Sequence, residues 1–389
     1  MKQQITIYDQ ICFTIKYELA FDLEKVMEIG IIGLPRSGKT TIFNAVTKGS
    51  RAVAGYSSKL NVGVAKVPDE RLTALANMYR PRRVVPAEVT YTDLPPPPEG
   101  FGQTRGISGE YLNAIQSVDA LLIAVRAFAN SSVSHVDEMI DPIRDAENML
   151  MEMTFSDIDL LDRRLARIQE GFKKAKVQDR GDLQREQDLL LRIKESLNSG
   201  VALRDQQLAS DEIRRISGFG FLSIKPLIVV MNIGEEQLEE SEALENQLGD
   251  VVTGQHVRST VMCAQLEMEL AQMDPQDEQE FRKDLGTIES SLHRIVRVSY
   301  DVVGRISFFT VGEDEVRAWE IPRRTVAQQA AGKIHTEVQR GFIRAEVISY
   351  ENLVKCGGLG EARKLGLLRQ EGKDYVLEDG EIMHVLFNI

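Results

Sequence analysis

The sequence predicts an α/β protein whose main domain is a doubly wound, mostly parallel sheet. The first observation is a set of short apolar runs, Met27–Ile32, Val118–Val125 and Pro226–Met231. Continuous apolar runs of this length are typical of parallel strands buried on both faces. The second observation is that segments with helical spacing separate the runs, as in right-handed βαβ units. The third is a glycine-rich loop that directly follows the first run.

This loop reads G-x-x-x-x-G-K-T and lies between the first strand and the helical segment Thr41–Val46. Strand, glycine loop and helix are the setting of a phosphate-binding P-loop, in which inward N–H groups and a helix start meet the phosphates. Lys39 would reach the β- and γ-phosphates, and the Thr40 hydroxyl would bind Mg²⁺. The alternative is an ordinary turn, but the four fixed positions match by chance in only about one chain in a hundred. The candidate phosphate-binding residues of the loop are Gly33, Leu34, Pro35, Arg36, Ser37, Gly38, Lys39 and Thr40.

Composition and charge bear on the partners and the cellular location to be expected. The 389 residues carry a net charge of −12, so an RNA partner would have to meet a local basic face rather than the whole surface. The three cysteines lie far apart, without the spacing of a metal site or a disulfide framework, which favours a reducing, cytoplasmic location. No stretch approaches 18 consecutive apolar residues, so we expect no membrane span and no membrane partner. DNA is not expected as a partner either, and we expect a monomer.

Residues 1–26 precede the first predicted strand. They lack the charged start, long apolar run and cleavage site of a secretory signal. We expect a weakly ordered N-terminal extension, and an added edge strand at Ile5–Tyr8 is the alternative.

Two further residues are candidate Mg²⁺ ligands. Asp93 ends the predicted strand Ala87–Thr92, where a nucleotide hydrolase keeps a metal-associated carboxylate, although a turn residue at a strand end is the alternative. Ser57 lies in the loop after the P-loop helix, and a solvated serine-rich loop explains it equally well. The usual Asp-x-x-Gly is absent, because Pro96 stands where the glycine would be and offers no N–H to a γ-phosphate. The glycine-containing stretch Glu99–Gly109 is expected to be a mobile switch loop.

The base-recognition position is predicted after the strand Pro226–Met231. A guanine reader would have Asn-Lys-x-Asp there, whereas this chain has Asn232, Ile233, Gly234 and Glu235. Without the bidentate aspartate, the main discrimination against adenine is lost, so we infer ATP, with GTP binding left open. A plain strand exit is the alternative. After a further predicted strand, the backbone of Cys263 and Ala264 would flank the base.

Domain organisation follows from changes in pattern. Residues 27–140 and 216–301 are expected to form the P-loop G domain, and residues 141–215 an inserted antiparallel coiled coil with its joint near Val177–Gly181. The charges of this insertion are most simply a solvated face, and a partner-binding arm is the alternative. Residues 302–389 have short expected strands around one main helix, among them Phe342–Ile348, Tyr375–Leu377 and Ile382–Phe387, and so predict a small β-grasp domain that binds partners.

With these pieces assembled, the chain resembles the Obg-like ATPase family of the YchF type over about residues 27 to 389. The most specific motifs are Gly30–Pro35, Val67–Arg71 and the Asn-x-x-Glu at Asn232, with Phe308–Thr310, Gly341–Glu346 and Gln370–Tyr375 near the C-terminus. The resemblance implies a C-terminal TGS domain, ATP preferred over GTP, Mg²⁺ and association with the ribosome, in particular its large subunit or RNA. It also implies that Arg36 to Thr41 hold the phosphates, that Thr40 and Ser57 bind Mg²⁺, and that the Ile233 backbone meets adenine.

The chain departs from the family pattern at the motifs of hydrolysis. Arg36-Ser37 replaces Asn-Val, Ser57 replaces a threonine, Ala124 lies where bacterial members carry a histidine, and prolines follow Asp93. Nucleotide binding survives such changes more easily than hydrolysis. We therefore expect a slow Mg²⁺-dependent ATPase with Lys39 and Asp93 as catalytic residues. A non-hydrolysing, nucleotide-gated RNA- or ribosome-binding module and a conventional Obg-type GTPase are the alternatives.

Overall fold

The computed structural model describes residues 27–47, 60–98, 107, 109–129, 139–174, 176–285 and 290–388. They form two compact units. The larger unit consists of Glu28–Val64 and Thr90–Val303, and the C-terminal unit contains Ala65–Val89 and Gly304–Ile389. The expected N-terminal extension, with the segment Ile5–Tyr8, lies outside the described residues, as does Ser57. Within the described part of the chain, no helix is long and apolar enough to span a bilayer.

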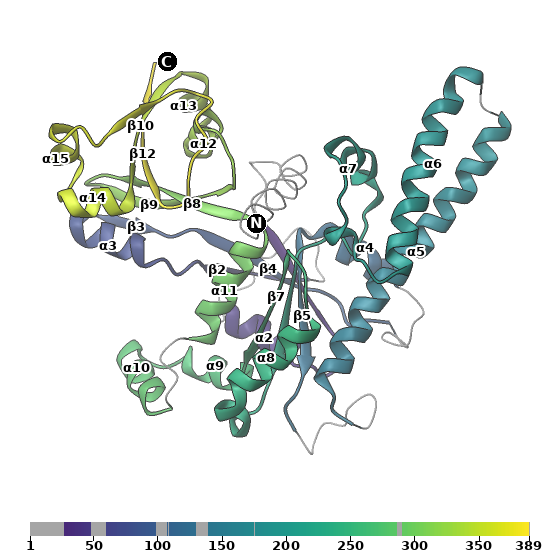
Figure 1. The fold of residues 1–389 in the computed structure, drawn as a ribbon. Helices are drawn as coiled ribbons and strands as arrows, with labels where there is room; N and C mark the ends of the chain where they lie inside the picture. Colours follow the sequence, from purple (N-terminus) through teal and green to yellow (C-terminus); the bar gives the residue numbers. More distant parts are fainter. Residues whose placement is uncertain are drawn as a thin grey trace, which may run out of the picture. The chain divides into compact units, whose positions relative to one another are not determined.

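A six-stranded sheet forms the centre of the larger unit (Figure 1). Its strands, in spatial order, are β2 (Asn61–Lys66), β4 (Glu88–Asp93), β1 (Glu28–Gly33), β5 (Ala120–Arg126), β6 (Leu227–Asn232) and β7 (Val257–Met262). The pairs β4–β1, β1–β5, β5–β6 and β6–β7 are parallel. Strands β5 and β6 are buried along their whole length, as their apolar sequences predict. The predicted α/β fold is confirmed.

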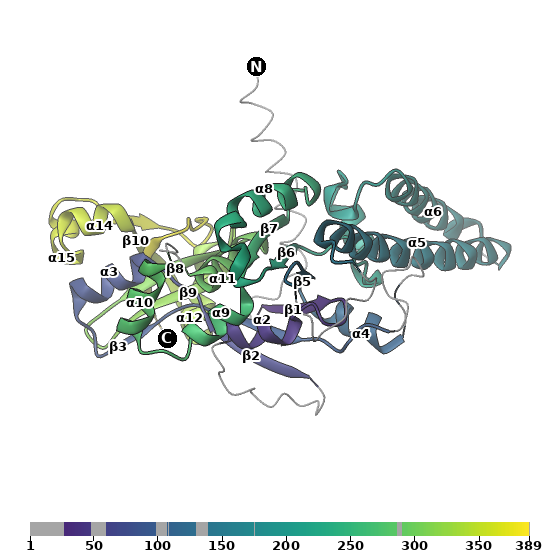
Figure 2. The ribbon, with the colours of Figure 1, turned by 90° about the horizontal axis from the view of Figure 1, so that it is seen from below.

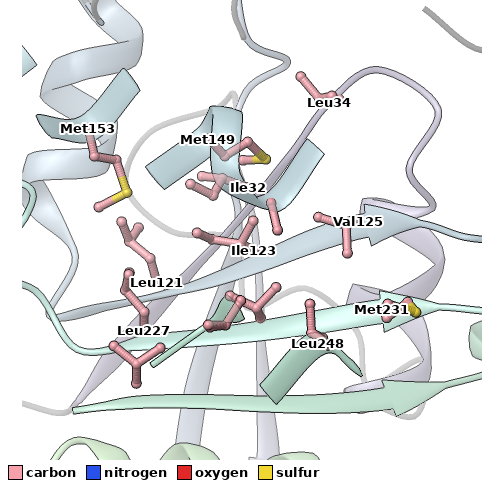
Figure 3. Close-up of a cluster of buried hydrophobic side chains, with 14 of the residues drawn as sticks. Ile32, Leu34, Leu121, Ile123, Val125, Met149, Met153, Leu227, Met231 and Leu248 are labelled. Atoms are coloured by element: carbon pink, nitrogen blue, oxygen red, sulfur yellow. The ribbon is translucent and has the colours of Figure 1, made fainter. Parts of the chain in front are cut away.

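Helices cover both faces of this sheet, and Figure 2 shows α2 on one side of the strands and α4 and α5 on the other. The core on the α5 side packs Met149 and Met153 against Ile32, Leu121 and Ile123 (Figure 3). On the α2 side, the buried Tyr91 hydroxyl donates to Ser299 of α11 over 2.8 Å. The helices outside the two long ones are α2 (Lys39–Val46), α4 (Gly109–Ser117), η1 (Leu203–Asp205), α7 (Ser210–Ile216), η2 (Ser217–Phe219), η3 (Glu235–Glu240), α8 (Ser241–Val251), α9 (Ala264–Leu270), α10 (Pro275–Asp284) and α11 (Ser291–Val302).

The two long helices are α5 (Pro142–Lys174) and α6 (Val177–Asn198). They pack through apolar side chains at helical spacing, including Leu161, Leu165, Ile168, Leu190, Ile193 and Leu197. The predicted joint at Val177–Gly181 is wrong, because α6 already begins at Val177 and Gly181 lies inside it. A single glycine costs a helix only about 1 kcal/mol, and packing of the apolar face outweighs it here. The function of this arm stays a prediction.

The C-terminal unit is built on a second six-stranded sheet. Its order is β11 (Arg369–Glu371), β10 (Phe342–Ser349), β12 (Glu381–Phe387), β8 (Arg305–Val311), β9 (Glu315–Pro322) and β3 (Arg83–Val85). Its helices are α3 (Glu70–Tyr79), α12 (Ala327–Ile334), α13 (Thr336–Arg340), α14 (Tyr350–Cys356) and α15 (Leu359–Lys364).

Two features of the C-terminal unit differ from the sequence-based expectation. Tyr375–Leu377 is not a strand, since only Val376 forms an isolated bridge, to Val326. Strand β3, from the segment Ala65–Val89, pairs in parallel with β9 and extends the C-terminal sheet. The four proposed domain boundaries and the TGS assignment stay predictions.

Candidate functional site

The glycine-rich loop joins β1 to α2 in a tight backbone path. Arg36 has φ 67° and Gly38 has φ 86°, both in the left-handed region that favours glycine. The Ser37 N–H donates to the Leu34 carbonyl over 3.1 Å, which closes the turn. A Cβ at Gly38 would lie 2.1 Å from Asn232 Nδ2, and one at Gly33 would lie 2.5 Å from Ser37 Oγ. Close approach therefore requires glycine at both positions, and at Gly38 the backbone conformation requires it as well.

Lys39 and Thr40, the first residues of α2, meet at the end of β4. The Lys39 ammonium lies 2.6 Å from Asp93 Oδ1 and also donates to the Leu94 carbonyl. The Thr40 hydroxyl donates to the other carboxylate oxygen, Oδ2, over 3.0 Å. Parallel pairing of β1 with β4 sets Ile31 opposite Asp93 and so brings the two loop ends together. The structure thus joins the predicted phosphate-binding lysine and two of the predicted metal ligands in one cluster.

Asn232, at the end of β6, connects the glycine loop to the predicted base-recognition loop. Its side-chain amide donates to the Ser37 carbonyl over 3.1 Å, and its Oδ1 accepts from the Ala264 N–H over 3.1 Å. The residue is buried. A single asparagine therefore fixes the position of the phosphate loop relative to the start of α9, with both halves of its amide used.

The remaining predicted base contacts lie around the same strand end. Ile233 is buried and its N–H donates to the Met262 carbonyl over 2.9 Å. Glu235 is the first residue of η3 and its side chain is exposed. The N–H of the preceding residue, Gly234, donates to Gln237 Oε1 over 2.9 Å. Cys263 is buried immediately before α9, and burial raises the pKa of its thiol, with a contribution from the Glu235 carboxylate. A buried thiol of raised pKa packs here as a small apolar group.

The residues present fit a Mg²⁺-bound nucleotide. Within the described part of the chain, the buried Ser37 hydroxyl has no hydrogen-bond partner, although it lies in the loop that would surround a phosphate. A Cβ at Gly33 or Gly38 would collide with Ser37 or Asn232, so only glycine lets the loop keep the tight path that a phosphate-binding backbone needs. Asp93 and Thr40 are the oxygen ligands that Mg²⁺ prefers. Ser57 and most of the predicted switch loop, residues 99–106 and 108, lie outside the described residues.

One basic side chain beside the site was missed by sequence reasoning. Arg126 ends β5, is buried, and donates through Nε to the Phe128 carbonyl over 3.1 Å. Burial lowers the pKa of its guanidinium, and the charge of Arg36 lowers it further, which places the two arginines in one electrostatic environment. The signal was available, because an arginine at the end of an otherwise apolar strand next to the P-loop strand is unusual. The Leu94 carbonyl, which accepts a hydrogen bond from Lys39, could not be predicted, because a backbone acceptor is not marked by residue type.

Comparison with known proteins agrees with this geometry. Residues 28–155 match the family described as "50S ribosome-binding GTPase", and residues 305–388 match the family YchF-GTPase_C, described as a protein of unknown function (DUF933). A "Ribosome-binding ATPase YchF" from Bacillus subtilis (strain 168) is 34% identical over 92% of this chain and 99% of its own length. This chain belongs to the YchF family.

Further YchF relatives support the assignment. The protein of the same name from Escherichia coli O157:H7 is 35% identical, over 92% of this chain and 99% of its own length. The solved structure of a Schizosaccharomyces pombe YchF GTPase superimposes with a TM-score of 0.80 at 28% identity, covering 92% of this chain and 97% of that one. The resemblance inferred from the motifs is therefore confirmed. The two names differ in the nucleotide, ATP in one and GTP in the other.

Proposed function

We propose that this YchF protein is a slow, Mg²⁺-dependent ATPase that acts as a nucleotide-controlled switch on the ribosome. Its curated relatives are named ribosome-binding ATPases, and its P-loop region matches a ribosome-binding GTPase family. The observation that carries the proposal is the cluster in which Lys39 and Thr40 share the Asp93 carboxylate. These are the groups that a Mg²⁺-bound triphosphate needs at the end of a P-loop.

The chain's own residues have distinct tasks in this mechanism. When a triphosphate enters, Lys39 leaves Asp93 and moves to the β- and γ-phosphate oxygens, while the loop N–H groups orient the phosphates. Thr40 and Asp93, freed of the ammonium, would hold Mg²⁺, which neutralises the charge that develops on the transferred phosphoryl group. Asn232 keeps the loop and the base contacts in register.

The preference for ATP rests on the loop after β6. Guanine offers two donors, N1–H and the 2-amino group, which a short, positioned carboxylate accepts together. Here that place is taken by the longer and exposed Glu235. Leaving the guanine donors unmet costs about 1–3 kcal/mol, whereas adenine has no such pair of donors to leave unmet.

Slow turnover is inferred from the residues after Asp93. Pro96 has no N–H to donate to a γ-phosphate, and Pro97 cannot orient a water through its side chain. Since neither proline can position the attacking water, we infer that catalysis rests mainly on the electrostatic contribution of Lys39 and the metal site.

Nucleotide titration tests the ATPase proposal. We expect Mg²⁺–ATP to bind at least as tightly as Mg²⁺–GTP, and Lys39→Ala to abolish phosphate release. The exposed Lys283 serves as control, since Lys283→Ala removes a charge of the same kind outside the site. GTP binding a hundredfold tighter than ATP, about 2.7 kcal/mol, would refute the argument from Glu235.

The proline run also favours a second candidate, a nucleotide-gated ribosome-binding module that does not hydrolyse. Phosphate release by purified protein with and without ribosomes separates the two. Release that depends on Lys39 eliminates the second candidate. If the protein binds nucleotide but releases no more phosphate than the Lys39→Ala variant, the ATPase proposal is eliminated.

A further inference from the structure

A second candidate site lies in the larger unit, on the helical arm rather than at the nucleotide loop. It is a concave pocket of about 500 Å³ between α5 and the segment α7–η2. Figure 1 shows α7 beside the two long helices. Four arginines line it, namely Arg163, Arg164, Arg167 and Arg215, above an apolar floor of Leu160 and Phe219. We call this set the arginine pocket.

One of the four arginines is held in place by the fold. Arg164 donates to Glu186 of α6 over 2.7 Å and lies 5.7 Å above the ring of Phe219. That ring in turn stacks on Phe221 at 5.5 Å between centroids. The Glu186 hydrogen bond raises the pKa of the Arg164 guanidinium. Arg164 and Phe219 therefore form a fixed wall of the pocket.

The other three arginines are available to a ligand. Among the described residues, the side chains of Arg163, Arg167 and Arg215 make no ion pair or hydrogen bond. Two acidic side chains of the arm are paired with other bases, since Glu212 meets Arg192 at 2.6 Å and Asp182 meets Arg185. Asp182 also attracts the charge of Arg215, so Arg163 and Arg167 carry most of the unpaired positive charge of the pocket. The pocket thus keeps local positive charge in a chain whose net charge is −12.

We propose that the arginine pocket binds the phosphate backbone of an RNA strand. This rests on the proposed function, in which the ribosome is the partner. Guanidinium groups pair with phosphate oxygens through two parallel N–H donors. Arg163 and Arg167 are one helical turn apart on α5, a rise of about 6 Å, so they form a row that can follow successive phosphates. Arg215 contributes from the opposite wall.

An acidic protein segment is the other ligand that arginines could take. Carboxylates also pair with guanidinium groups, but they do not recur along a protein chain as phosphates do along RNA. A row of cations one turn apart and a second wall opposite fit a repeating anion. The acidic segment is therefore an outcome of the test and not the proposal.

The test compares two charge-reversal variants of the full-length protein. Arg163→Glu with Arg167→Glu alters the arginine pocket. Lys174→Glu with Arg180→Glu makes the same change in charge at exposed positions near the joint of the same two helices. Binding of a labelled single-stranded oligouridine RNA is measured by anisotropy across a salt series, and ATP affinity is measured in parallel. Ribosome co-sedimentation is the third readout.

We expect the pocket variant to bind RNA at least tenfold more weakly, with the slope of log K against log salt reduced by about 0.7 per lost phosphate contact. The matched variant should keep most of the affinity, and both should bind ATP like the wild type. Equal RNA binding by the two variants would overturn the proposal, and so would polyglutamate displacing the RNA at equal charge concentration. RNA binding that depends on the pocket without co-sedimentation would instead refute the ribosome as partner and leave the pocket intact.

Discussion

The Lys39 ammonium lies 2.6 Å from one oxygen of Asp93, and the Thr40 hydroxyl donates to the other oxygen over 3.0 Å. One carboxylate therefore satisfies both groups that the triphosphate and its metal would otherwise engage. Asp93 is about nine-tenths buried, so its charge is weakly screened by water. A triphosphate that entered without Mg²⁺ would place negative charge beside this carboxylate.

Chelation of Mg²⁺ should therefore weaken ATP binding through Asp93. In the wild type we expect EDTA to weaken ATP binding at least tenfold, about 1.4 kcal/mol. Lys39 must move from Asp93 to the phosphates, and without Mg²⁺ no positive charge then balances the Asp93 carboxylate. In Asp93→Ala the repulsion is gone and the effect of EDTA should fall to about threefold or less. Titration with a fluorescent ATP analogue, with and without EDTA, measures both.

The exposed Asp250 supplies the control, since Asp250→Ala removes a carboxylate of the same unit away from the loop. It should respond to EDTA like the wild type. An equal effect of EDTA in Asp93→Ala and Asp250→Ala would mean that Asp93 does not face the metal.

Asn232 should be needed for loop geometry as well as for stability. Asn232→Ala leaves the buried Ala264 N–H without an acceptor and the Ser37 carbonyl without its donor, which should cost about 1–3 kcal/mol in urea unfolding. Asn232→Asp keeps the acceptor for the Ala264 N–H but sets a buried carboxylate oxygen against the Ser37 carbonyl, so it should be destabilised at least as much. Both should bind ATP more weakly, as measured by titration. Unchanged ATP affinity in the two variants would show that the loop keeps its shape without this amide.

The fold could be predicted where local sequence decided it. The apolar strands β1, β5 and β6 and the P-loop are encoded in consecutive residues, and the structure places them within a residue or two of the prediction. The pairing of β3 with β9 could not be predicted from local sequence. It joins Arg83–Val85 to Glu315–Arg317 across more than half of the chain, and three residues are too short to show a period.

In the candidate site too, residues within a local motif could be predicted, whereas contacts that depend on the fold could not. Motif spacing predicts Lys39, Asp93 and Asn232 as site residues, because backbone geometry fixes which residue types can work at those positions. It did not reveal that Lys39 would lie on Asp93, since this contact depends on the register of β1 against β4. The arginine pocket was also not anticipated, because its residues are ordinary surface arginines until α5 and α7 are brought together.

Stability should depend on pH through Asp157, a buried carboxylate of α5. Its two oxygens accept from the Leu222 and Ser223 N–H groups at 2.8 Å each, yet burial outweighs these bonds and raises the pKa of Asp157 to about 6. Because the folded pKa exceeds the unfolded value, the folded state takes up the proton first as the pH falls from 7 to 5. The wild type should therefore gain about 1 kcal/mol relative to Asp157→Asn over this range.

Urea unfolding of both proteins at several pH values measures this difference, and the asparagine variant cancels the contribution of all other groups. At pH 7 the wild type has lost this gain, since stability conferred by a raised carboxyl pKa disappears as the pH rises through it. A difference between the two proteins that stayed constant from pH 7 to 5 would show that Asp157 does not titrate there.

The buried ion pair of Arg282 and Glu267 should hold α10 and α11 to α9. The Arg282 guanidinium donates to both Glu267 oxygens, at 3.1 and 2.7 Å, and Glu267 also accepts from the Ser291 N–H at the start of α11 over 2.8 Å. Both side chains are buried.

Arg282→Met leaves the Glu267 charge buried with fewer donors, so it should lower the free energy of unfolding by about 3–5 kcal/mol. The double variant Arg282→Met with Glu267→Met removes both charges and should recover most of that loss. The exposed neighbour Lys283 provides the matched control, since Lys283→Met should change stability by less than about 0.5 kcal/mol. If the double variant were no more stable than Arg282→Met, the cost would come from lost packing of the arginine stem and not from the unpaired carboxylate.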